Sequence, residues 1–367
     1  MKLRYKILSG TAVLLLISFG ALALTIGHTS ACIDPPALSA GTDSMKAVSY
    51  YCYGPPEVLQ YGDIEKPVPG DDEIQVKVIA ASVNPLDWHY MRGSPYIMRL
   101  FVGIGAPDDA RMGVDFAGIV TAVGSKVKRY KTGDSVFGGR SGAFGEYLVI
   151  PETRAVAHKP ENVGFEEAAA VPIAAITALQ ALRDAGKLQA GQKVLINGAS
   201  GGVGTYATQI AKAFGAEVHG VCSTRNVELV KSIGADRVWD YKKENYTEGD
   251  ERYDIIIDNV GNHSPLTNTR VLKEDGILVM VGGAPGNWVG PFKGAIQTMY
   301  TAPFVSPKIE SILARMDQAD LQILADLMAE GKMRSVIDRR FSLDQVPAAI
   351  TYSESGRARG KIIVNVD

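Results

Sequence analysis

The sequence predicts an α/β protein in which a parallel α/β module is inserted into a β-rich module, and two regions of different texture support this prediction. From Lys46 to about Ile150, short alternating apolar segments such as Ile74 to Val78 and Phe144 to Val149 are separated by glycine and proline, which is typical of antiparallel strands. After Glu166, continuous apolar strands alternate with amphipathic helices, as in a parallel sheet covered on both faces.

The composition is that of a globular, enzyme-sized protein. The chain has 367 residues, 46% of them hydrophobic, which is enough for two domains with substantial cores. Its 38 lysines and arginines against 40 acidic residues give a net charge of −2, which argues against a nucleic-acid partner. The three cysteines, Cys32, Cys52 and Cys222, are far apart and support neither a disulfide framework nor a Cys-x-x-Cys metal site.

The amino-terminal segment is expected to be a membrane anchor. No charged residue lies between Ile7 and Gly27, and a helix of that length, at about 1.5 Å per residue, spans roughly 30 Å, the thickness of a bilayer core. Lys2, Arg4 and Lys6 precede this segment, so the positive-inside rule keeps the amino terminus in the cytoplasm and sends the rest of the chain across. The side of the membrane on which the body lies stays open.

Two alternatives to an uncleaved anchor over residues 1–27 are a cleaved signal peptide and a lipoprotein signal that ends at Cys32. The anchor is favoured because the apolar region is longer than the roughly 7–15 residues of a signal peptide. Thr29 is also a poor match to the branched apolar residue of a lipoprotein signal. Residues 28–45, which include Pro35 and Pro36, are expected to form a linker, so the folded body starts near Met45.

The later elements follow from the apolar runs. The clearest strands of the parallel module are Val194 to Ile196, Val218 to Val221, Ile255 to Ile257 and Ile277 to Val281. A helix over Leu321 to Glu330 ends at Gly331, and Lys361 to Val366 forms a final strand.

A glycine-rich turn gives the strongest chemical signal. It joins the strand at Val194 to a helix over Thr205 to Phe214, the context required of a dinucleotide-binding G-x-G-x-x-G motif. The candidate cofactor-binding residues of this turn are Ala199, Ser200, Gly201, Gly202, Val203 and Gly204. Ala199 replaces the first glycine, Gly201 lets the backbone approach a pyrophosphate, and Gly204 lets the helix pack close to the strand. The helix amino terminus favours an anion.

The end of the second strand predicts NADPH rather than NADH. An NAD site usually has a carboxylate there for the ribose 2′-hydroxyl, whereas this chain has Ser223, Thr224 and Arg225. Two hydroxyls and a guanidinium can bind a 2′-phosphate. The alternative is that Arg225 only solvates the start of a helix.

Several ordered segments then resemble the medium-chain dehydrogenase/reductase superfamily, in particular its zinc-free branch of quinone oxidoreductases and enoyl-type reductases. The matching segments are Met45 to Val48, Gly54 to Leu59, Ser82 to Asp87, Gly113 to Gly118, Ala170 to Pro172, Gly198 to Gly204, Asp258 to Gly261, Val281 to Gly283 and Gly360 to Lys361. The resemblance implies a GroES-like β domain over 46–174 and 308–367, split around a Rossmann doubly wound parallel sheet over 175–307, with the active site in the cleft between them. A homodimer is implied only by analogy with related reductases.

The ligands of the zinc alcohol dehydrogenases in this superfamily are missing. Those enzymes carry a cysteine near the start of the first motif and Gly-His-Glu in the second, whereas this chain has Ser82 to Asp87 without cysteine or histidine, and Gly113, Val114 and Asp115. We therefore expect no zinc, and oxidation of a simple alcohol, which needs a Lewis acid, is disfavoured. A quinone or an activated carbonyl compound, such as a conjugated enone, can take a hydride without a metal because the acceptor spreads the arriving charge over its own oxygen.

The catalytic candidates lie in one segment. Asn84 is the first candidate for a polar contact at the nicotinamide and substrate, and His89 or Tyr90 is a candidate proton donor. The alternatives are that His89 caps or packs a surface loop, or that water supplies the proton. Further cofactor-binding candidates implied by the resemblance are Thr177, Asn259, Val260, Gly282 and Lys361.

The sequence thus favours a zinc-independent, NADPH-dependent reductase of a quinone or α,β-unsaturated carbonyl compound. Two alternatives stay open: a membrane-tethered NADPH-binding sensor or scaffold without catalysis, and an NAD(P)-dependent alcohol dehydrogenase.

Overall fold

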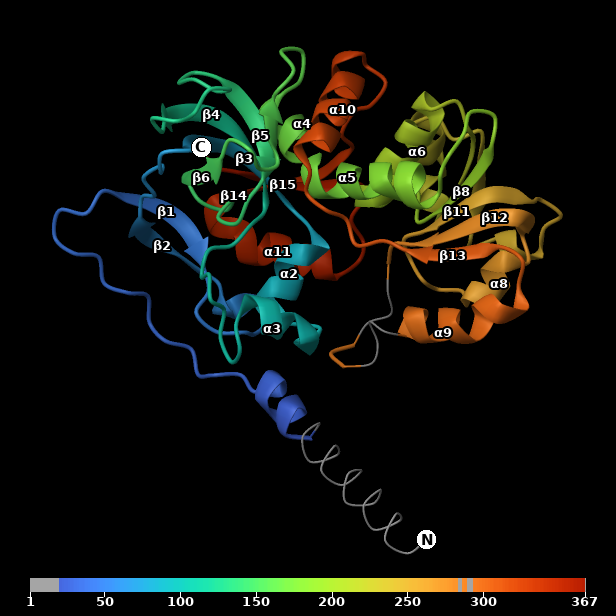
Figure 1. Ribbon diagram of the computed structural model, residues 1–367, viewed down its shortest axis with the longest axis horizontal. Helices are drawn as coiled ribbons and strands as arrows, with labels where there is room; N and C mark the ends of the chain where they lie inside the picture. The colour runs from blue at the N-terminus through green and yellow to red at the C-terminus, as the bar shows by residue number, and fades with distance from the viewer. Residues whose placement is uncertain (1–19, 283–285, 289–292, 367) are drawn as a thin grey trace, which may run out of the picture.

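A computed structural model of the chain describes residues 20–282, 286–288 and 293–366, and these residues form two large sheets and a two-stranded sheet with helices around them (Figure 1). The first, β-rich half contains a seven-stranded sheet with the order β14-β15-β3-β4-β5-β7, in which β6 also pairs with β3. A separate hairpin is formed by β1 (Ser44–Ser49) and β2 (Gln60–Glu65). Strand β1 begins one residue before Met45, the expected start of the folded body, and that boundary stays a prediction.

The strands of the seven-stranded sheet come from both ends of the folded body. They are β3 (Glu73–Val83), β4 (Asp115–Val123), β5 (Ser135–Gly139), β6 (Tyr147–Pro151), β7 (Val156–His158), β14 (Ile337–Ser342) and β15 (Lys361–Asn365). The early strands β3 to β7 pair antiparallel, as their alternating pattern predicts. The final strand β15 pairs antiparallel with β3, so the chain returns to its first sheet, and the predicted insertion is confirmed.

The second half is a six-stranded parallel sheet with the order β10-β9-β8-β11-β12-β13. Its strands are β8 (Lys193–Asn197), β9 (Glu217–Cys222), β10 (Arg237–Asp240), β11 (Tyr253–Asp258), β12 (Leu272–Met280) and β13 (Lys308–Ser311). Because β13 pairs with β12, the segment expected from residue 308 onward in the β-rich domain begins with a strand of the parallel sheet. The expected domain boundaries otherwise stay a prediction.

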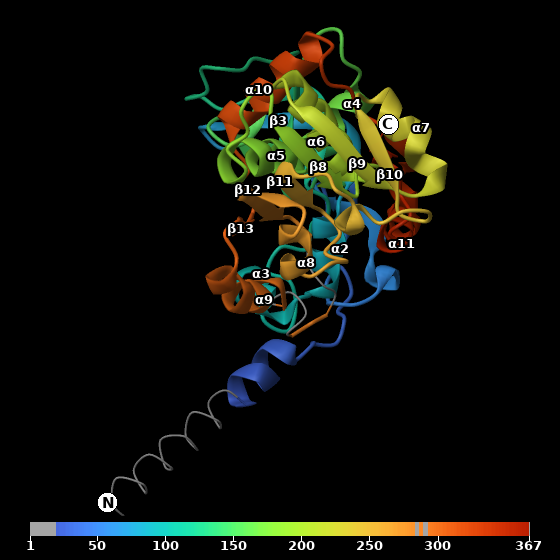
Figure 2. The same ribbon diagram turned by 90° about the vertical axis from the view of Figure 1, so that its right-hand side faces the viewer.

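Helices lie around both halves of the fold and cover both faces of the parallel sheet. The helices of the first half of the chain are α2 (Pro85–Arg92), α3 (Arg99–Val102), α4 (Phe165–Ala169) and α5 (Pro172–Gln180). Those of the second half are α6 (Gly202–Ala213), α7 (Val227–Ser232), α8 (Pro265–Thr269), α9 (Lys293–Thr301), α10 (Gln318–Ala329) and α11 (Val346–Glu354). Helices α5 and α6 lie on one face of the sheet and α8 and α9 on the other (Figures 1 and 2), which explains the continuously apolar strands.

The expected membrane anchor requires a correction. Within the described residues, no helix is both long enough and apolar enough to cross a bilayer. Residues 1–19 of the expected anchor lie outside the described part of the chain, and the described remainder is helical over 20–27, which spans only about 12 Å. The end of this helix packs on the protein itself, because the buried Arg99 donates hydrogen bonds to the carbonyl oxygens of Ile26 and His28 at 3.1 and 2.7 Å.

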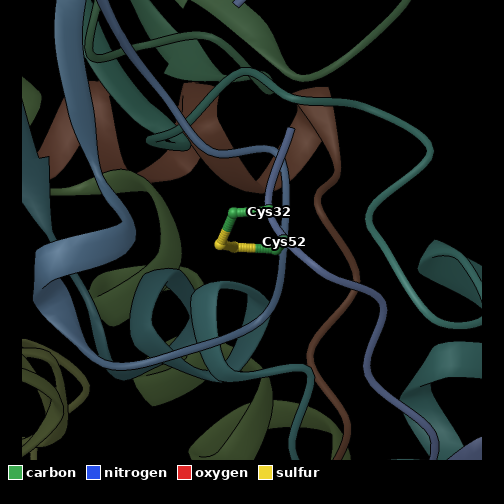
Figure 3. Close-up of a disulfide and its surroundings, with 2 residues drawn as sticks. All are labelled: Cys32 and Cys52. Atoms are coloured by element: carbon green, nitrogen blue, oxygen red, sulfur yellow. A yellow bond between two sulfur atoms is a disulfide. The ribbon is translucent and has the colours of Figure 1, made fainter. Parts of the chain in front are cut away.

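The expectation that the cysteines form no disulfide is also wrong. Cys32 and Cys52 are joined by a disulfide, with Cα atoms 4.8 Å apart (Figure 3), while Cys222 is free and buried. Ser30 N–H donates to Gly105 O at 2.8 Å just before this bond. The expected linker is therefore fixed to the β-rich half at its start. A sulfur engaged in a disulfide also cannot carry a lipid thioether, which argues against the lipoprotein alternative at Cys32.

Candidate active site

A cleft of about 860 Å³ lies between the two halves of the fold. Its walls come from the start of α2, the turn between β8 and α6, the ends of β9 and β11, and the segment that leads into β15. The cleft thus lies at the carboxyl ends of the central parallel strands, where open α/β sheets bind ligands.

The glycine-rich turn has the shape that a dinucleotide requires. Strand β8 ends at Asn197 and α6 begins at Gly202, and Gly198 has φ +81°, which a side chain would strain. A Cβ on Gly204 would lie 2.1 Å from Gly198 O, so only glycine permits this approach of helix to strand. Gly201, by contrast, has its nearest neighbour at 3.4 Å, so the space beside it is free for a pyrophosphate at the N–H groups of the first helical turn.

Two buried amide oxygens near the cleft also fit a polar ligand. Asn226 donates from Nδ2 to Ser200 Oγ at 2.9 Å, and Asn259 donates from Nδ2 to Asn197 O at 3.0 Å. The Oδ1 atom of each of these two amides is buried and has no hydrogen-bond partner in the described part of the chain. A buried acceptor without a hydrogen-bond partner costs free energy. Both oxygens therefore suit a ligand with hydrogen-bond donors, such as the hydroxyl and amide groups of a dinucleotide.

The rim at the end of β9 carries two arginines. Ser223 and Arg225 line the cleft together with Arg357, and an N–H of Arg225 donates to Arg357 O at 2.9 Å. The sequence argument that no carboxylate lies nearby overlooked Asp240, which pairs with Cys222 across β9 and β10. Hydrogen bonding by Thr224 lowers the pKa of Asp240, so this carboxylate is already engaged, and it lies outside the cleft lining.

A buried polar network lies beneath the cleft where α2 begins. Asn84 donates from Nδ2 to Asp115 Oδ2 at 2.9 Å, and the Lys361 ammonium donates to Asn84 Oδ1 at 2.5 Å. Lys361 Nζ is also 3.7 Å from Asp115 Oδ2. The exposed fractions of Asn84, Asp115 and Lys361 are 2%, 0% and 3%, so a cation and an anion are both held away from water.

Burial dominates the titration of this network. Burial lowers the pKa of Lys361 and raises the pKa of Asp115, and each shift is opposed by the charge of the other group. Burial also raises the pKa of Asp87 to about 7, against a hydrogen bond from Asn84 N–H at 2.7 Å. The other oxygen of Asp87, Oδ1, is buried without a hydrogen-bond partner among the described residues, which is the position that a proton would take.

His89 and Tyr90, the candidate proton donors, are not among the residues that line the cleft. His89 Nδ1 lies 2.6 Å from Ser94 O, and its ring stacks on Trp88 with centroids 3.9 Å apart. Burial lowers the pKa of His89. His89 lies within α2 and packs against the segment that follows the helix, so its contacts are structural, and the proton-donor role stays a prediction.

The structure brings most of the other candidates together. Those that line the cleft are Asn84, Ser200, Gly201, Gly202, Val203, Gly204, Ser223, Arg225, Asn259, Val260 and Lys361. Those that lie outside its lining are Thr177, Ala199, Thr224 and Gly282. Of the latter, Ala199 is fully buried under the turn, and Thr177 bonds to Ile173 O within α5, so both have structural contacts.

Sequence reasoning missed two kinds of residue at this site. Asp87 and Asp115 were not proposed as site residues, although an acidic residue in a buried apolar strand or at the start of a helix is itself a signal. Tyr241 and Arg357 line the rim of the cleft, but they lie in loops whose position no local pattern reveals.

Among the described residues, no group of three or more His, Cys, Asp and Glu side chains is placed to hold a metal ion.

Two family models match the chain. The model described as an alcohol dehydrogenase GroES-like domain matches residues 70–161, and the model described as a zinc-binding dehydrogenase matches residues 233–364. The first covers β3 to β7 of the β-rich half, and the second covers β10 to β13 of the parallel sheet and the final strands β14 and β15.

Curated relatives and solved structures match over most of the chain. A 2-methylene-furan-3-one reductase of Solanum lycopersicum is 34% identical over 336 residues, covering 88% of this chain and 79% of the relative. An NADPH-dependent alkenal/one oxidoreductase, chloroplastic, of Arabidopsis thaliana is 31% identical and covers 91% of this chain and 83% of the relative. The structure of the quinone oxidoreductase from Coxiella burnetii has a TM-score of 0.78 at 30% identity, covering 89% of this chain and 100% of that chain.

Proposed function

The chain belongs to the medium-chain dehydrogenase/reductase superfamily, in its quinone oxidoreductase-like branch, and we propose that it is an oxidoreductase that uses NADPH to reduce a quinone or an α,β-unsaturated carbonyl compound without zinc. The observation that carries the proposal is the cleft at the carboxyl ends of β8, β9 and β11, with the glycine-rich turn at one side and Asn84 at the other. The matched relatives are named as reductases of these substrate classes.

The reduced nicotinamide, when bound, supplies a hydride to the substrate. The chain's own residues would bind and orient the cofactor: the first turn of α6 would hold the pyrophosphate, and the amide oxygens of Asn226 and Asn259, which have no partner among the described residues, would accept from its donors. Of the proposed site residues, Asn84 and Lys361 provide the polar floor, and His89, Tyr90 or water supplies the proton.

The preference for NADPH over NADH is supported by the rim residues. Ser223 and Arg225, with Arg357 beside them, offer hydroxyl and guanidinium donors that suit a 2′-phosphate. Replacing Arg225 with Ala is expected to raise the Kd for NADPH by about tenfold, as for loss of one charge-assisted contact of about 1.4 kcal/mol, and to leave the Kd for NADH nearly unchanged. Equal effects on both cofactors would contradict the preference.

The reductase activity is tested with the purified full-length chain and a panel of quinones, enones and simple alcohols. NADPH oxidation with a quinone or an enone is the expected result, and activity should survive removal of zinc by a chelator. Binding of NADPH with no turnover across the panel would favour a nucleotide-binding sensor instead. Zinc-dependent oxidation of an alcohol would favour an alcohol dehydrogenase.

The nucleotide site itself has a sharp test in Gly201. Because a Cβ fits beside Gly201 in the free protein, Gly201→Ala should fold with an unchanged melting temperature and yet bind NADPH at least about tenfold more weakly, since the methyl group enters the space of the pyrophosphate. Gly62→Ala, at a strand glycine with nothing within 4 Å, is the control. Unchanged NADPH binding by Gly201→Ala would contradict the site.

A homodimer is also proposed. Strand β13 forms one edge of the described parallel sheet, and an open strand edge is suited to pairing with a second copy. Sedimentation velocity of the full-length chain would show a dimer, and a monomer at micromolar concentration would exclude this proposal.

A further inference from the structure

The side chain of Asn84 has little freedom to reorient. One of its amide N–H groups donates to Asp115 Oδ2 at 2.9 Å and the other faces Ser82 O at 3.4 Å. Its oxygen accepts from the Lys361 ammonium. Turning the amide over would place its NH₂ group against the ammonium and its oxygen against the carboxylate. The amide is therefore fixed, and one lone pair of Oδ1 is left for a donor bound in the cleft.

Lys361 is also attached to the nucleotide turn. The residue before it, Gly360, donates from its N–H to Ser200 O at 2.9 Å, and Gly360 forms a bridge with Gly201. A Cβ on Gly202 would lie 3.4 Å from Lys361 Cδ, so the lysine stem runs along the turn. Lys361 thus connects the loop expected to hold the pyrophosphate with the amide expected to meet the nicotinamide.

We propose that Lys361 is a positioning residue of this reductase: its ammonium group fixes the amide of Asn84 against Asp115 and holds that amide in register with the glycine-rich turn. The inference rests on the proposed function, because Asn84 is taken to contact the cofactor or the substrate. It assigns Lys361 an action through Asn84, which itself begins α2 as the capping residue.

The chemistry of the pair favours a cation for this task. A neutral donor at position 361 could bond to Asn84, but it would leave the fully buried Asp115 without a compensating charge. An uncompensated buried charge is strongly destabilising. Lys361 meets both needs, because its Nζ contacts Asn84 Oδ1 and lies 3.7 Å from Asp115. Its donation to Val83 O at 3.3 Å fixes the ammonium further.

The test removes the cation without leaving an unpaired carboxylate. Asp115→Asn is the starting background, and Lys361→Met and Asn84→Ala are added to it singly and together. Each protein is checked for cooperative unfolding, and kcat, KM and the Kd for NADPH are measured. We expect Lys361→Met to lower kcat by about 100-fold, as for a small misplacement of a reacting group, while the Kd for NADPH changes far less.

The decisive readout is the double-mutant cycle on kcat. If Lys361 acts through Asn84, then Lys361→Met has no further effect once Asn84 is Ala. Effects of the two changes that multiply independently would overturn the proposal, and so would an unchanged kcat for Lys361→Met. The matched control, Lys193→Met, removes a lysine at the opposite end of the parallel strands and should leave kcat unchanged.

A second readout keeps this inference separate from the proposed function. In protein labelled with ¹⁵N-asparagine, the side-chain NH₂ signals of Asn84, assigned by their loss in Asn84→Ala, should move when Lys361→Met is added to Asp115→Asn. If the wild type oxidises no NADPH, the proposed function fails, and this NMR measurement still decides whether Lys361 holds the amide. Unmoved Asn84 signals would overturn the proposal whether or not the enzyme is active.

Discussion

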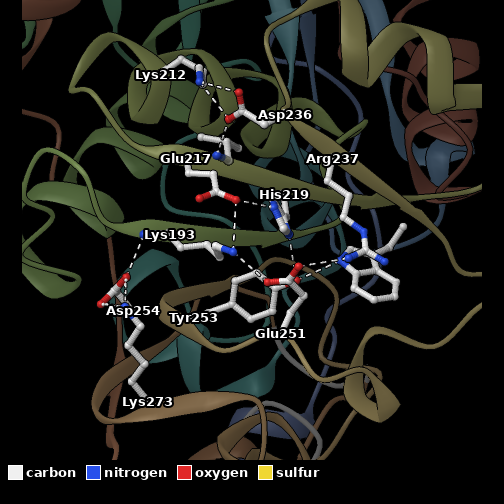
Figure 4. A network of polar contacts seen from close by, with 12 residues as sticks. Lys193, Lys212, Glu217, His219, Asp236, Arg237, Glu251, Tyr253, Asp254 and Lys273 are labelled. Atoms are coloured by element: carbon white, nitrogen blue, oxygen red, sulfur yellow. Dashed lines mark hydrogen bonds and ion pairs between the residues drawn. The ribbon is translucent and has the colours of Figure 1, made fainter.

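One network of charged side chains lies on the parallel sheet at the amino ends of its strands, a second lies in the β-rich half beneath the cleft, and the two networks behave in opposite ways. At the amino ends, Lys193 lies 2.7 Å from Glu251 and 3.1 Å from Glu217, close to the first residues of β8 and β9 (Figure 4). Near the carboxyl ends, beneath the cleft, Lys361 lies with Asn84 and Asp115. The first network is partly exposed and the second is sealed from water.

The pKa values show which physical effect wins in each network. Hydrogen bonding to Glu251 raises the pKa of Lys193, and the same bond lowers the pKa of Glu251. In this network the effect of the hydrogen-bonded partner on the pKa is therefore larger than the effect of burial. In the network under the cleft, burial lowers the pKa of Lys361 and raises those of Asp115 and Asp87. A solvated network of this kind contributes little to stability, whereas a buried one opposes folding unless every member is paired. This contrast supports the proposal that the buried network serves the cleft rather than stability.

The largest expected loss of stability follows the removal of one buried charge. Asp115→Ala leaves the Lys361 ammonium buried without its carboxylate and removes the acceptor for the N–H groups of Asn84 and Ile173. We expect the free energy of unfolding to fall by about 3–5 kcal/mol, measured by urea denaturation. A loss below about 1 kcal/mol would mean that breaking this buried pair costs no more stability than breaking a surface ion pair.

The second expected effect is a dependence of stability on pH through Asp87. The pKa of Asp87 is about 7 in the folded protein against an ordinary value of 3.8, so the folded state binds more protons between these values. The stability that Asp87 contributes is full below about pH 4 and is lost as the pH rises towards 7, with a slope of up to about 1.4 kcal/mol per pH unit.

Asp87→Asn tests this dependence, because the amide oxygen can still accept from Asn84 N–H. The variant should match the wild type near pH 4 and be the more stable of the two near pH 7, as followed by denaturation at a series of pH values. Parallel curves for the two proteins would show that Asp87 does not titrate in this window.

The smallest effect is expected at the amino ends. Glu251→Gln removes the carboxylate that faces Lys193 and Arg237, and it should lower the free energy of unfolding by less than about 1 kcal/mol, with the difference shrinking at high salt. Because the pKa of Glu251 is lowered, its contribution is present above its ordinary pKa of 4.5 and is lost in acid, the reverse of Asp87. A loss as large as that of Asp115→Ala would erase the contrast between the two ends.

The sequence by itself predicted the class of the fold, which the structure confirms, and a place for the nucleotide, which is part of the proposed function. Continuous apolar strands such as Val194 to Ile196 and the turn over Gly198 to Gly204 are local patterns, and each predicts its own backbone because burial on both faces and close helix packing act on neighbouring residues. The absence of a carboxylate from the segment Ser223 to Arg225 is likewise a local pattern.

Only the tertiary structure decided which distant residues share the cleft and how they are paired. Lys361 meets Asn84 because the last strand, β15, pairs with β3, and Cys32 meets Cys52 because the amino-terminal segment folds back on the β-rich half. The apolar run before Gly27 predicted a membrane span, but the packing of its end on Arg99 is a contact across 73 positions in the chain. Burial and pairing depend on such contacts, and no local pattern records them.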